Sequence, residues 1–239
     1  MNLLLFKSNE WCNPLPGRDA RVIHIKKILR ACVGDSLSAG VLGGKLGTAV
    51  LKDIAEDGSM SFGFTAETDP LPLYPLTLLV GTPRPPTARR LLKDLSSAGI
   101  GRIIFCGTDL GEKSYLTSSL WVKEEYKSAI LEGISQGKST LLPEIVKLYS
   151  LYKAIGMIDN DCDKLALDNV SPDLPLRQYQ PSGKESCLAI GPERGWSDRE
   201  RQMLRDADFS ICSMGERVLR TETACHMGLA LIQAARKYI

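Results

Sequence analysis

The sequence predicts an α/β protein in two parts, a small β-rich domain followed by a larger domain built on a parallel sheet. Three observations support this. Residues 69–75 hold three prolines, which can continue neither a helix nor a central strand. Short strand-like runs separated by glycine turns precede this segment, and strand-like runs alternate with helical runs after it. We therefore expect domains at residues 1–68 and 73–239, each large enough to bury a core.

The first domain is predicted to be a small β-barrel or sandwich. Four runs have the composition of strands, at residues 3–6, 36–42, 46–54 and 59–64. Glycine-containing turns at residues 43–44 and 57–58 separate the later runs. One helix is expected at residues 19–29, because Val22, Ile25 and Leu29 recur at helical spacing.

The second domain is predicted to be a parallel sheet covered by helices. Strands are expected at residues 76–81, 102–106, 154–158, 187–191 and 209–213. Helices are expected at residues 87–98, 119–134, 198–206 and 221–238. Strands that alternate with helices imply crossover connections, and these produce parallel pairing. The last helix is apolar on nearly every side, which predicts cover by more than one neighbour, most simply a second copy of the chain.

Composition disfavours several classes of protein. The 30 basic residues nearly cancel the 28 acidic ones, and a net charge of +2 by itself argues against a nucleic-acid binder. Seven cysteines without a C-x-x-C pair fit neither a zinc ribbon nor a disulfide framework, and two histidines exclude a His-rich metal site. No apolar run approaches the ~18–20 residues of a membrane span. We expect a soluble, cytoplasmic protein with no membrane partner and no metal.

Two segments combine a strand end, a glycine turn and the start of a helix. In residues 190–200, Ser197 and Glu200 have the spacing of a capping box. In residues 214–224, Thr221 is the expected N-cap, and Glu222 lies in the first turn of the helix. Such turns lie at the carboxyl edge of a parallel sheet, where ligands usually bind, although an ordinary connecting loop has the same pattern. Neither segment matches a Walker A loop or a dinucleotide fingerprint.

The same two segments also match longer motifs, Gly191-Pro192-Glu193-x-Gly195-Trp196-Ser197-x-x-Glu200 and Gly215-x-Arg217-Val218-Leu219-Arg220-Thr221-Glu222-Thr223-Ala224. Together they resemble the paired signature of the RsmE-type methyltransferases that modify uridine N3 in 16S ribosomal RNA, which belong to the SPOUT, or α/β-knot, superfamily. The segment His24-Ile25-x-Lys27-Ile28-Leu29-Arg30 with Val33-Gly34-Asp35 is similar to that family's N-terminal barrel.

This resemblance implies a PUA-like RNA-binding β-barrel followed by a SPOUT domain with a C-terminal trefoil knot. It also implies S-adenosyl-L-methionine as methyl donor, a homodimer formed through the C-terminal domain, and 16S rRNA or the small ribosomal subunit, at its decoding region, as substrate. The family holds its cofactor between three loops, the third placed here after a strand that ends near residue 158. The implied cofactor-binding residues are Ile158, Ile190, Gly191, Pro192, Glu193, Gly195, Met214, Gly215, Val218 and Leu219.

Methyl transfer from a sulfonium needs alignment and removal of the N3 proton rather than a metal. Arg220 is expected to hold an RNA phosphate or to stabilise the deprotonated uracil oxygen. Glu222 is expected to orient Arg220 or to accept a proton. For both residues the alternative is a structural ion pair at the start of a helix.

Two segments are locally basic although the net charge of the chain is small, and such segments predict a surface that binds RNA. Residues 18–30 carry five basic side chains and one acid, and residues 84–94 carry four basic side chains and one acid. The expected RNA contacts are Arg18, Arg21, His24, Lys27, Arg30, Arg194 and Arg217. A solvated helix surface is the alternative for the first segment.

The chain also departs from the family. Arg194 stands where the family usually has glycine, and the expected Glu-Gln-x-x-Arg stretch reads Ser135-Gln136-Gly137-Lys138-Ser139. Two other functions therefore remain open. One is a SPOUT enzyme that methylates the ribose 2′-oxygen, and the other is a non-catalytic RNA-binding or assembly factor with the same fold.

Overall fold

A computed structural model describes residues 2–239, which divide into two compact units. The first unit comprises the chain up to Leu73 together with Ser96–Gly99 and Ile130–Leu142. The second unit comprises Tyr74–Leu95, Ile100–Ala129 and Pro143–Ile239. Two short segments from the middle of the chain thus pack with the N-terminal region, as the Ser135 Oγ shows by donating to the Leu3 carbonyl at 2.7 Å.

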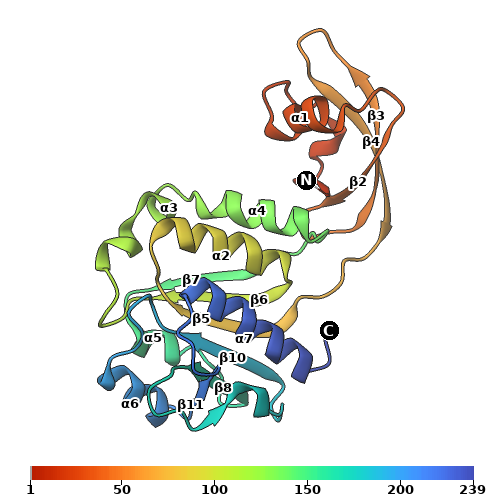
Figure 1. Cartoon of the computed structure of the whole chain (residues 1–239). Helices are drawn as coiled ribbons and strands as arrows, with labels where there is room; N and C mark the ends of the chain where they lie inside the picture. The colour runs from red at the N-terminus through yellow and green to blue at the C-terminus, as the bar shows by residue number, and fades with distance from the viewer. Residues whose placement is uncertain (1) are drawn as a thin grey trace. The chain divides into compact units, whose positions relative to one another are not determined.

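The first unit is built on a four-stranded sheet in the order β1-β2-β3-β4 (Figure 1). The strands are β1 (Leu4–Phe6), β2 (Ser36–Val41), β3 (Leu46–Ile54) and β4 (Met60–Thr68). The first pair is parallel and the other two are antiparallel. A core that includes Phe6, Ile25 and Leu51 joins this sheet to the helical segment. The four predicted strands are confirmed, although β4 runs further than expected.

The helix predicted at residues 19–29 changes its hydrogen bonding midway. It follows a 3₁₀ turn (η1, Glu10–Cys12), begins as α1 (Ala20–His24) and continues as a π-helical segment (η2, Ile25–Leu29). Asp19 is the N-cap, since its carboxylate accepts from the Arg21 amide at 2.8 Å. The helix ends at Arg30, whose φ of +52° is left-handed.

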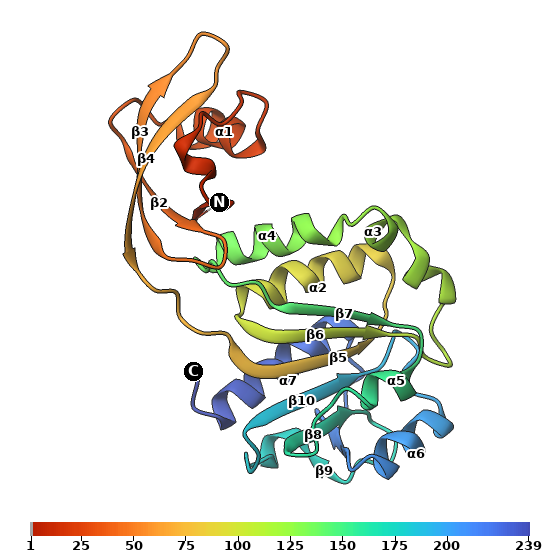
Figure 2. The same cartoon turned by 180° about the vertical axis from the view of Figure 1, so that it is seen from behind.

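The second unit contains a seven-stranded sheet in the order β7-β6-β5-β10-β8-β11-β9 (Figures 1 and 2). Its strands are β5 (Tyr74–Gly81), β6 (Ile100–Cys106), β7 (Glu144–Leu148), β8 (Cys162–Leu167), β9 (Leu174–Pro175), β10 (Glu185–Ile190) and β11 (Ser210–Ser213). Every strand pair in it is parallel. The predicted α/β class with a parallel sheet is confirmed. All carboxyl ends therefore meet at one edge of the sheet.

Helices cover both faces of this sheet. The helical segments that follow β5 in the chain are α2 (Pro85–Ser97), η3 (Lys113–Thr117), α3 (Ser119–Val122), α4 (Tyr126–Gln136), α5 (Leu151–Ile155), η4 (Leu176–Gln178), α6 (Asp198–Asp206) and α7 (Thr221–Ala235). Figures 1 and 2 show α7 on one face and α5 and α6 on the other. On the α7 face, a Cβ added to Gly228 would lie 2.7 Å from Leu188 of β10, so glycine allows this helix its close approach.

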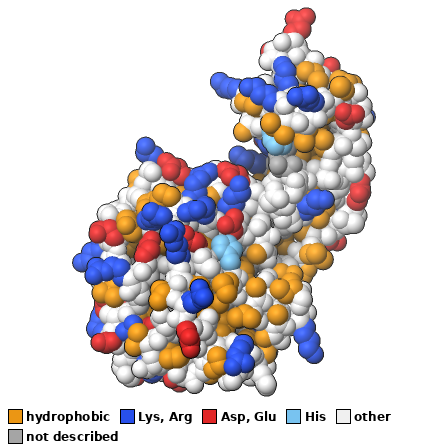
Figure 3. All heavy atoms as spheres, in the orientation of Figure 1, with side chains coloured by type: hydrophobic (Ala, Val, Ile, Leu, Met, Phe, Trp, Pro, Cys, Tyr) orange, Lys and Arg blue, Asp and Glu red, His pale blue; other side chains and the backbone are white. Residues whose placement is uncertain are grey.

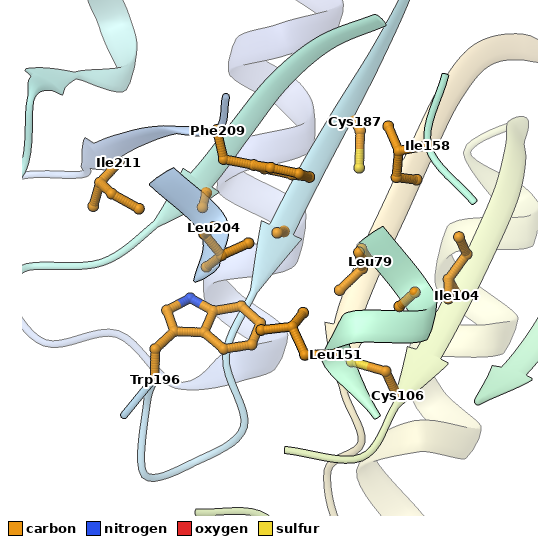
Figure 4. Close-up of a cluster of buried hydrophobic side chains, with 13 residues drawn as sticks. Leu79, Ile104, Cys106, Leu151, Ile158, Cys187, Trp196, Leu204, Phe209 and Ile211 are labelled. Carbon is orange, nitrogen blue, oxygen red and sulfur yellow. The ribbon is translucent and has the colours of Figure 1, made fainter. Parts of the chain in front are cut away.

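On the opposite face, α5 and α6 bury an apolar cluster against the sheet (Figure 4). The Trp196 indole is 1% exposed and lies beside Leu204 and Leu151. Its Nε1 donates to the Leu167 carbonyl at 3.1 Å, so this buried polar atom has a hydrogen-bond partner. Trp196 therefore ties the turn after β10 to the end of β8.

Two sequence predictions for this unit are wrong, and three of its strands were not predicted. Residues 154–158 do not form a strand, because Ser150 caps α5 by accepting from the Lys153 amide. The strands β7, β8 and β9 were not expected. The helix predicted at 119–134 is broken into α3 and α4, with Glu124 at a left-handed φ of +55° between them. Short apolar runs have no period that distinguishes a strand from one helical turn, which explains the first error.

A buried polar network joins the start of β8 to the end of α7. The Asp163 carboxylate accepts from the Tyr179 hydroxyl at 2.6 Å, the Gly183 amide at 2.8 Å and the Arg236 Nη2 at 3.0 Å. The side chains of Asp163 and Arg236 are 9% and 8% exposed. Burial raises the pKa of Asp163, but hydrogen bonds from Ser182, Tyr179 and Gly183 outweigh it and leave the pKa below its usual value.

We expect Asp163→Asn to lower the free energy of unfolding by about 3 kcal/mol at pH 7, because it leaves the Arg236 charge buried without its partner. Urea denaturation measures this. The folded-state pKa is the lower one, so the carboxylate stabilises the fold above its unfolded pKa of about 4. That contribution is lost as the pH falls through the folded pKa, and the two proteins should then converge. The matched control is Asp161→Asn, whose carboxylate is exposed, and an equal loss there would contradict the assignment.

Candidate ligand and active site

One cavity lies at the carboxyl ends of three adjacent strands, β8, β10 and β11. Because these strands are parallel neighbours, the loops that follow them converge on one cavity of about 310 Å³. Strands β6 and β7 extend the sheet on one side of β5, whereas β8 to β11 extend it on the other. Ligands bind near such a reversal in open α/β sheets. The cavity wall includes Ile190, Gly191, Pro192, Glu193, Arg194, Gly195, Met214, Gly215, Arg217, Val218 and Leu219. Two of the three loops are those that the sequence indicated.

The loop after β10 is a tight turn that depends on glycine. A Cβ at Gly191 would lie 3.0 Å from the Gly195 carbonyl carbon. Gly195 has a φ of +72°, and its amide donates to the Pro192 carbonyl at 2.8 Å. Nothing lies within 4 Å of a Cβ added at Gly195. The turn thus presents bare backbone to the cavity. The predicted capping box of Ser197 and Glu200 that begins α6 behind it is confirmed.

The third loop follows β8, not residue 158. Ile158 is 8% exposed and packs in the apolar cluster beneath α5 and α6, so it does not line this cavity. The loop at residues 168–170 takes its place in the cavity wall. Asp168 shapes it by accepting from the Asn169 and Val170 amides at 2.7 and 3.0 Å. The apolar run at residues 165–167 that ends in this Asp-Asn pair was the available signal.

An arginine of α6 holds this third loop in place. The Arg201 Nε donates to the Asp168 carboxylate at 2.6 Å, and the two side chains are 15% and 5% exposed. Trp196 binds the Leu167 carbonyl from the neighbouring turn. The loop after β8 and the turn after β10 are therefore connected to each other. Sequence reasoning missed Asp168 and Arg201.

A second opening of about 530 Å³ adjoins the first and shares Glu193, Arg194, Val218, Leu219 and Thr221 with it. We call it the reaction crevice. It brings together Arg220, Glu222, Arg84 and Tyr115. The Arg84 amide donates to the Glu193 carboxylate at 3.0 Å, which fixes the wall between the two openings. The residues predicted to be catalytic therefore lie beside the cavity and not inside it.

The start of α7 differs from its prediction. Arg220 is the N-cap residue, and it caps with no side-chain bond, whereas Thr221 is already helical. The Thr221 hydroxyl donates to the Gly191 carbonyl at 3.4 Å, so it links the helix to the glycine turn. Among the described residues, no ion pair joins Arg220 to Glu222. An ion pair at the helix start is thus not their role.

The predicted RNA contacts of the first unit have different environments. Arg18, Lys27 and Arg30 are exposed. The Arg21 guanidinium is bound to Glu10 at 2.8 Å and to Asp19 at 2.6 Å, and it donates to the Leu5 carbonyl. These carboxylates raise its pKa. Arg21 is therefore a structural residue and not a free cation for phosphate.

The remaining predicted contacts are divided between the two units. His24 is half-buried, and burial lowers its pKa, so its imidazole is neutral at pH 7. Arg194 and Arg217 are exposed on the wall of the cavity in the second unit. Figure 3 shows basic side chains mixed with acidic ones over α2 and α4, where Arg89, Arg90 and Lys93 belong to α2.

Two negative findings concern residues 2–239. Within that range, no group of His, Cys, Asp or Glu side chains is arranged to hold a metal ion. No helix among the same residues is both long and apolar enough to span a membrane.

A parallel sheet with a cavity enclosed by three loops defines a ligand-binding α/β protein, and the comparisons specify its class. Residues 69–233 match the RNA methyltransferase domain family. Ribosomal RNA small subunit methyltransferase E of Treponema pallidum is 35% identical, covering 98% of this chain and 91% of the relative. The corresponding protein E 1 of Borreliella burgdorferi is 32% identical, covering 94% of each. The chain therefore belongs to the ribosomal RNA small subunit methyltransferase E family.

Solved structures show the same fold. The enzyme of this name from Neisseria gonorrhoeae, bound to S-adenosyl methionine, has a TM-score of 0.79 at 20% identity and covers 98% of this chain and 97% of that one. A putative methyltransferase of Legionella pneumophila, in complex with the same cofactor, has a TM-score of 0.77 at 21% identity with the same coverage.

Proposed function

We propose that this chain methylates N3 of a uridine in 16S ribosomal RNA, in the decoding region of the small subunit, with S-adenosylmethionine as donor. The observation that carries the proposal is the connection between the three-loop cavity and the reaction crevice that holds Arg220 and Glu222. Relatives named as small-subunit rRNA methyltransferases, and similar folds solved with S-adenosylmethionine, support it.

The three-loop cavity, which we call the cofactor cavity, has the features that this cofactor needs. Backbone at Gly191, Gly195 and Gly215 offers amides and carbonyls without side-chain obstruction, which suits an adenine edge and the methionine carboxylate. Ile190, Val218 and Leu219 add apolar surface for the ring. Met214, Pro192 and Glu193 complete the assigned binding residues, and the loop at 168–170 replaces Ile158 among them.

The bound cofactor supplies an electrophilic methyl group, and the residues of the crevice prepare the nucleophile. We assign Glu222 as the acceptor of the N3 proton, so that the nitrogen lone pair becomes free to attack. The charge that results spreads onto the uracil oxygens, where the Arg220 guanidinium stabilises it. Both side chains are free of ion pairs among residues 2–239, which leaves them available for these roles.

Further parts of the proposal concern the rest of the molecule. We assign residues 1–68 as a PUA-like RNA-binding barrel with phosphate contacts from Arg18, Lys27 and Arg30, near His24. Residues 73–239 form the catalytic domain, with a C-terminal trefoil knot and RNA contacts from Arg194 and Arg217. The exposed apolar face of α7, where Met227 and Leu231 are 46% and 38% exposed, is assigned to a homodimer interface.

Two measurements test the function. Calorimetric titration with S-adenosylmethionine should show binding, and absence of binding at about millimolar concentration excludes the enzyme and leaves an RNA-binding factor. Methyl transfer should then be assayed on naked 16S RNA and on small subunits from cells that lack this protein. Mass spectrometry of the product locates the methyl group, and a methyl on the ribose 2′-oxygen would assign the other SPOUT chemistry.

A further inference from the structure

A third cavity opens at the carboxyl ends of β6 and β7, about 700 Å³ in volume and separate from the cofactor cavity. The loop after β6, the turn between β7 and α5, and one side of α6 form its walls. The roles proposed above use none of its own residues. We call it the tyrosine pocket, because Tyr149 and Tyr152 line it.

These two tyrosines are unusually exposed. Tyr149 is 65% exposed and Tyr152 is 74% exposed, and they are the only aromatic residues among the exposed large hydrophobic side chains of residues 2–239. Both belong to the same cavity wall. Exposed aromatic rings in a basic groove form stacking platforms in proteins that bind single-stranded nucleic acid.

The pocket wall carries charges of both signs, with the cations Lys113 and Arg199 and the carboxylates Asp109, Glu112 and Glu200. The Lys147 Nζ lies 5.3 Å from the centroid of the Tyr149 ring, and Lys113 lines the pocket. Each of these carboxylates already has partners within the protein. Asp109 pairs with Arg199 and accepts from the Ser197 hydroxyl at 2.6 Å. Glu200 is 1% exposed and accepts from the Asp109 and Ser197 amides, and Glu112 accepts from the Ser114 amide. The hydrogen bonds from Arg199 and Ser197 lower the pKa of Asp109.

The tyrosine pocket adjoins the reaction crevice. Gly111 and Glu112 line both openings, and the loop that carries them spans the space between the two. The two openings are therefore close enough in the fold for neighbouring nucleotides of one strand to occupy both.

We propose that the tyrosine pocket binds a nucleotide that flanks the target uridine, with its base stacked on Tyr149 or Tyr152 and its phosphate near Lys147 and Lys113. This inference rests on the proposed function for the choice of RNA as ligand. It makes the pocket a determinant of substrate affinity that is separate from methyl transfer itself.

The test uses the full chain and a fluorescein-labelled oligouridylate of about nine nucleotides, a length within the site sizes of single-strand binders. Fluorescence anisotropy should show binding weakened about tenfold or more in the double variant Tyr149→Ala/Tyr152→Ala, since each stacked base contributes strongly. The double variant to phenylalanine should bind like the wild type, because it keeps both aromatic faces. Val122→Ala, which alters an exposed side chain of α3 outside the pocket, is the matched control.

A second pair of probes identifies the stacked base. Each keeps the central uridine and lacks the bases on either its 5′ or its 3′ side. The wild type should bind one of them more weakly than the intact probe, and the alanine variant should not distinguish that probe from the intact one. Equal binding of intact probe by wild type and alanine variant, or equal weakening by phenylalanine and alanine, would overturn the pocket assignment.

Failure of the proposed function has a different signature. In that case the wild type neither binds S-adenosylmethionine nor methylates small subunits, whatever the tyrosine variants do with oligouridylate. If cofactor binding and methylation are normal but the alanine variant binds RNA like the wild type, only the tyrosine pocket is refuted.

Discussion

Replacing Gly195 by valine is expected to weaken S-adenosylmethionine binding by about a hundredfold while the protein remains folded. Gly195 lines the cavity, and a Cβ at this position meets no protein atom within 4 Å. The valine side chain would therefore occupy open space at the cavity wall, where the cofactor is expected to contact the backbone. The left-handed φ of +72° adds backbone strain of about 1–2 kcal/mol, which lowers stability without unfolding the chain. Titration calorimetry and thermal unfolding measure the two effects separately.

Gly34→Val is the matched control for this prediction. Gly34 also has a left-handed φ, of +99°, and an added Cβ there likewise meets nothing within 4 Å. It belongs to the first unit and lies outside the cofactor cavity. The control should lose comparable stability and keep its cofactor affinity. Equal affinity in wild type and Gly195→Val would refute the placement of the cofactor against this turn.

Arg220→Ala should lower the methyl-transfer rate about 10²–10³-fold, the loss typical when one group that stabilises a developing oxyanion is removed. The dissociation constant for S-adenosylmethionine should change little, because Arg220 lines the reaction crevice and not the cofactor cavity. Single-turnover kinetics at saturating cofactor and RNA measure the first quantity, and calorimetry measures the second.

Two further variants separate charge from geometry. Arg220→Lys keeps the charge but loses the planar guanidinium, so it should recover only part of the rate. Arg177→Ala removes an exposed arginine of η4 that lines neither opening, and it should transfer methyl groups like the wild type. A proportional loss of rate and cofactor affinity in Arg220→Ala would place this residue in cofactor binding instead.

Much of the second unit could be predicted from local sequence patterns. The turn at residues 191–197 and the segment before α7 were recognisable because glycine, capping residues and a strand end follow one another within about ten residues. The capping box at Ser197 needed no knowledge of the fold. Errors arose where the signal was short, as at residues 154–158, whose apolar run belongs largely to α5 and the core beneath it.

Ion-pair partners were beyond the reach of such patterns. Arg21 and Arg18 lie in the same basic segment, yet only Arg21 is held by Glu10 and Asp19. The Asp168–Arg201 pair that fixes the third loop joins residues 33 positions apart. Hydrophobic periodicity does not predict such a contact, because a charged residue in an ion pair and one on the open surface have the same sequence pattern.

The sequence by itself determined the α/β class, the glycine turns and the identity of the charged residues beside them, because hydrophobic period and turn chemistry act over a few neighbouring residues. Only the tertiary structure decided which loops meet. The order β10-β8-β11 brings residues 168–170 beside the two recognised turns, and Gly111 and Glu112 connect the reaction crevice to the tyrosine pocket. Strand order results from packing between segments far apart in the chain, so local patterns do not contain it.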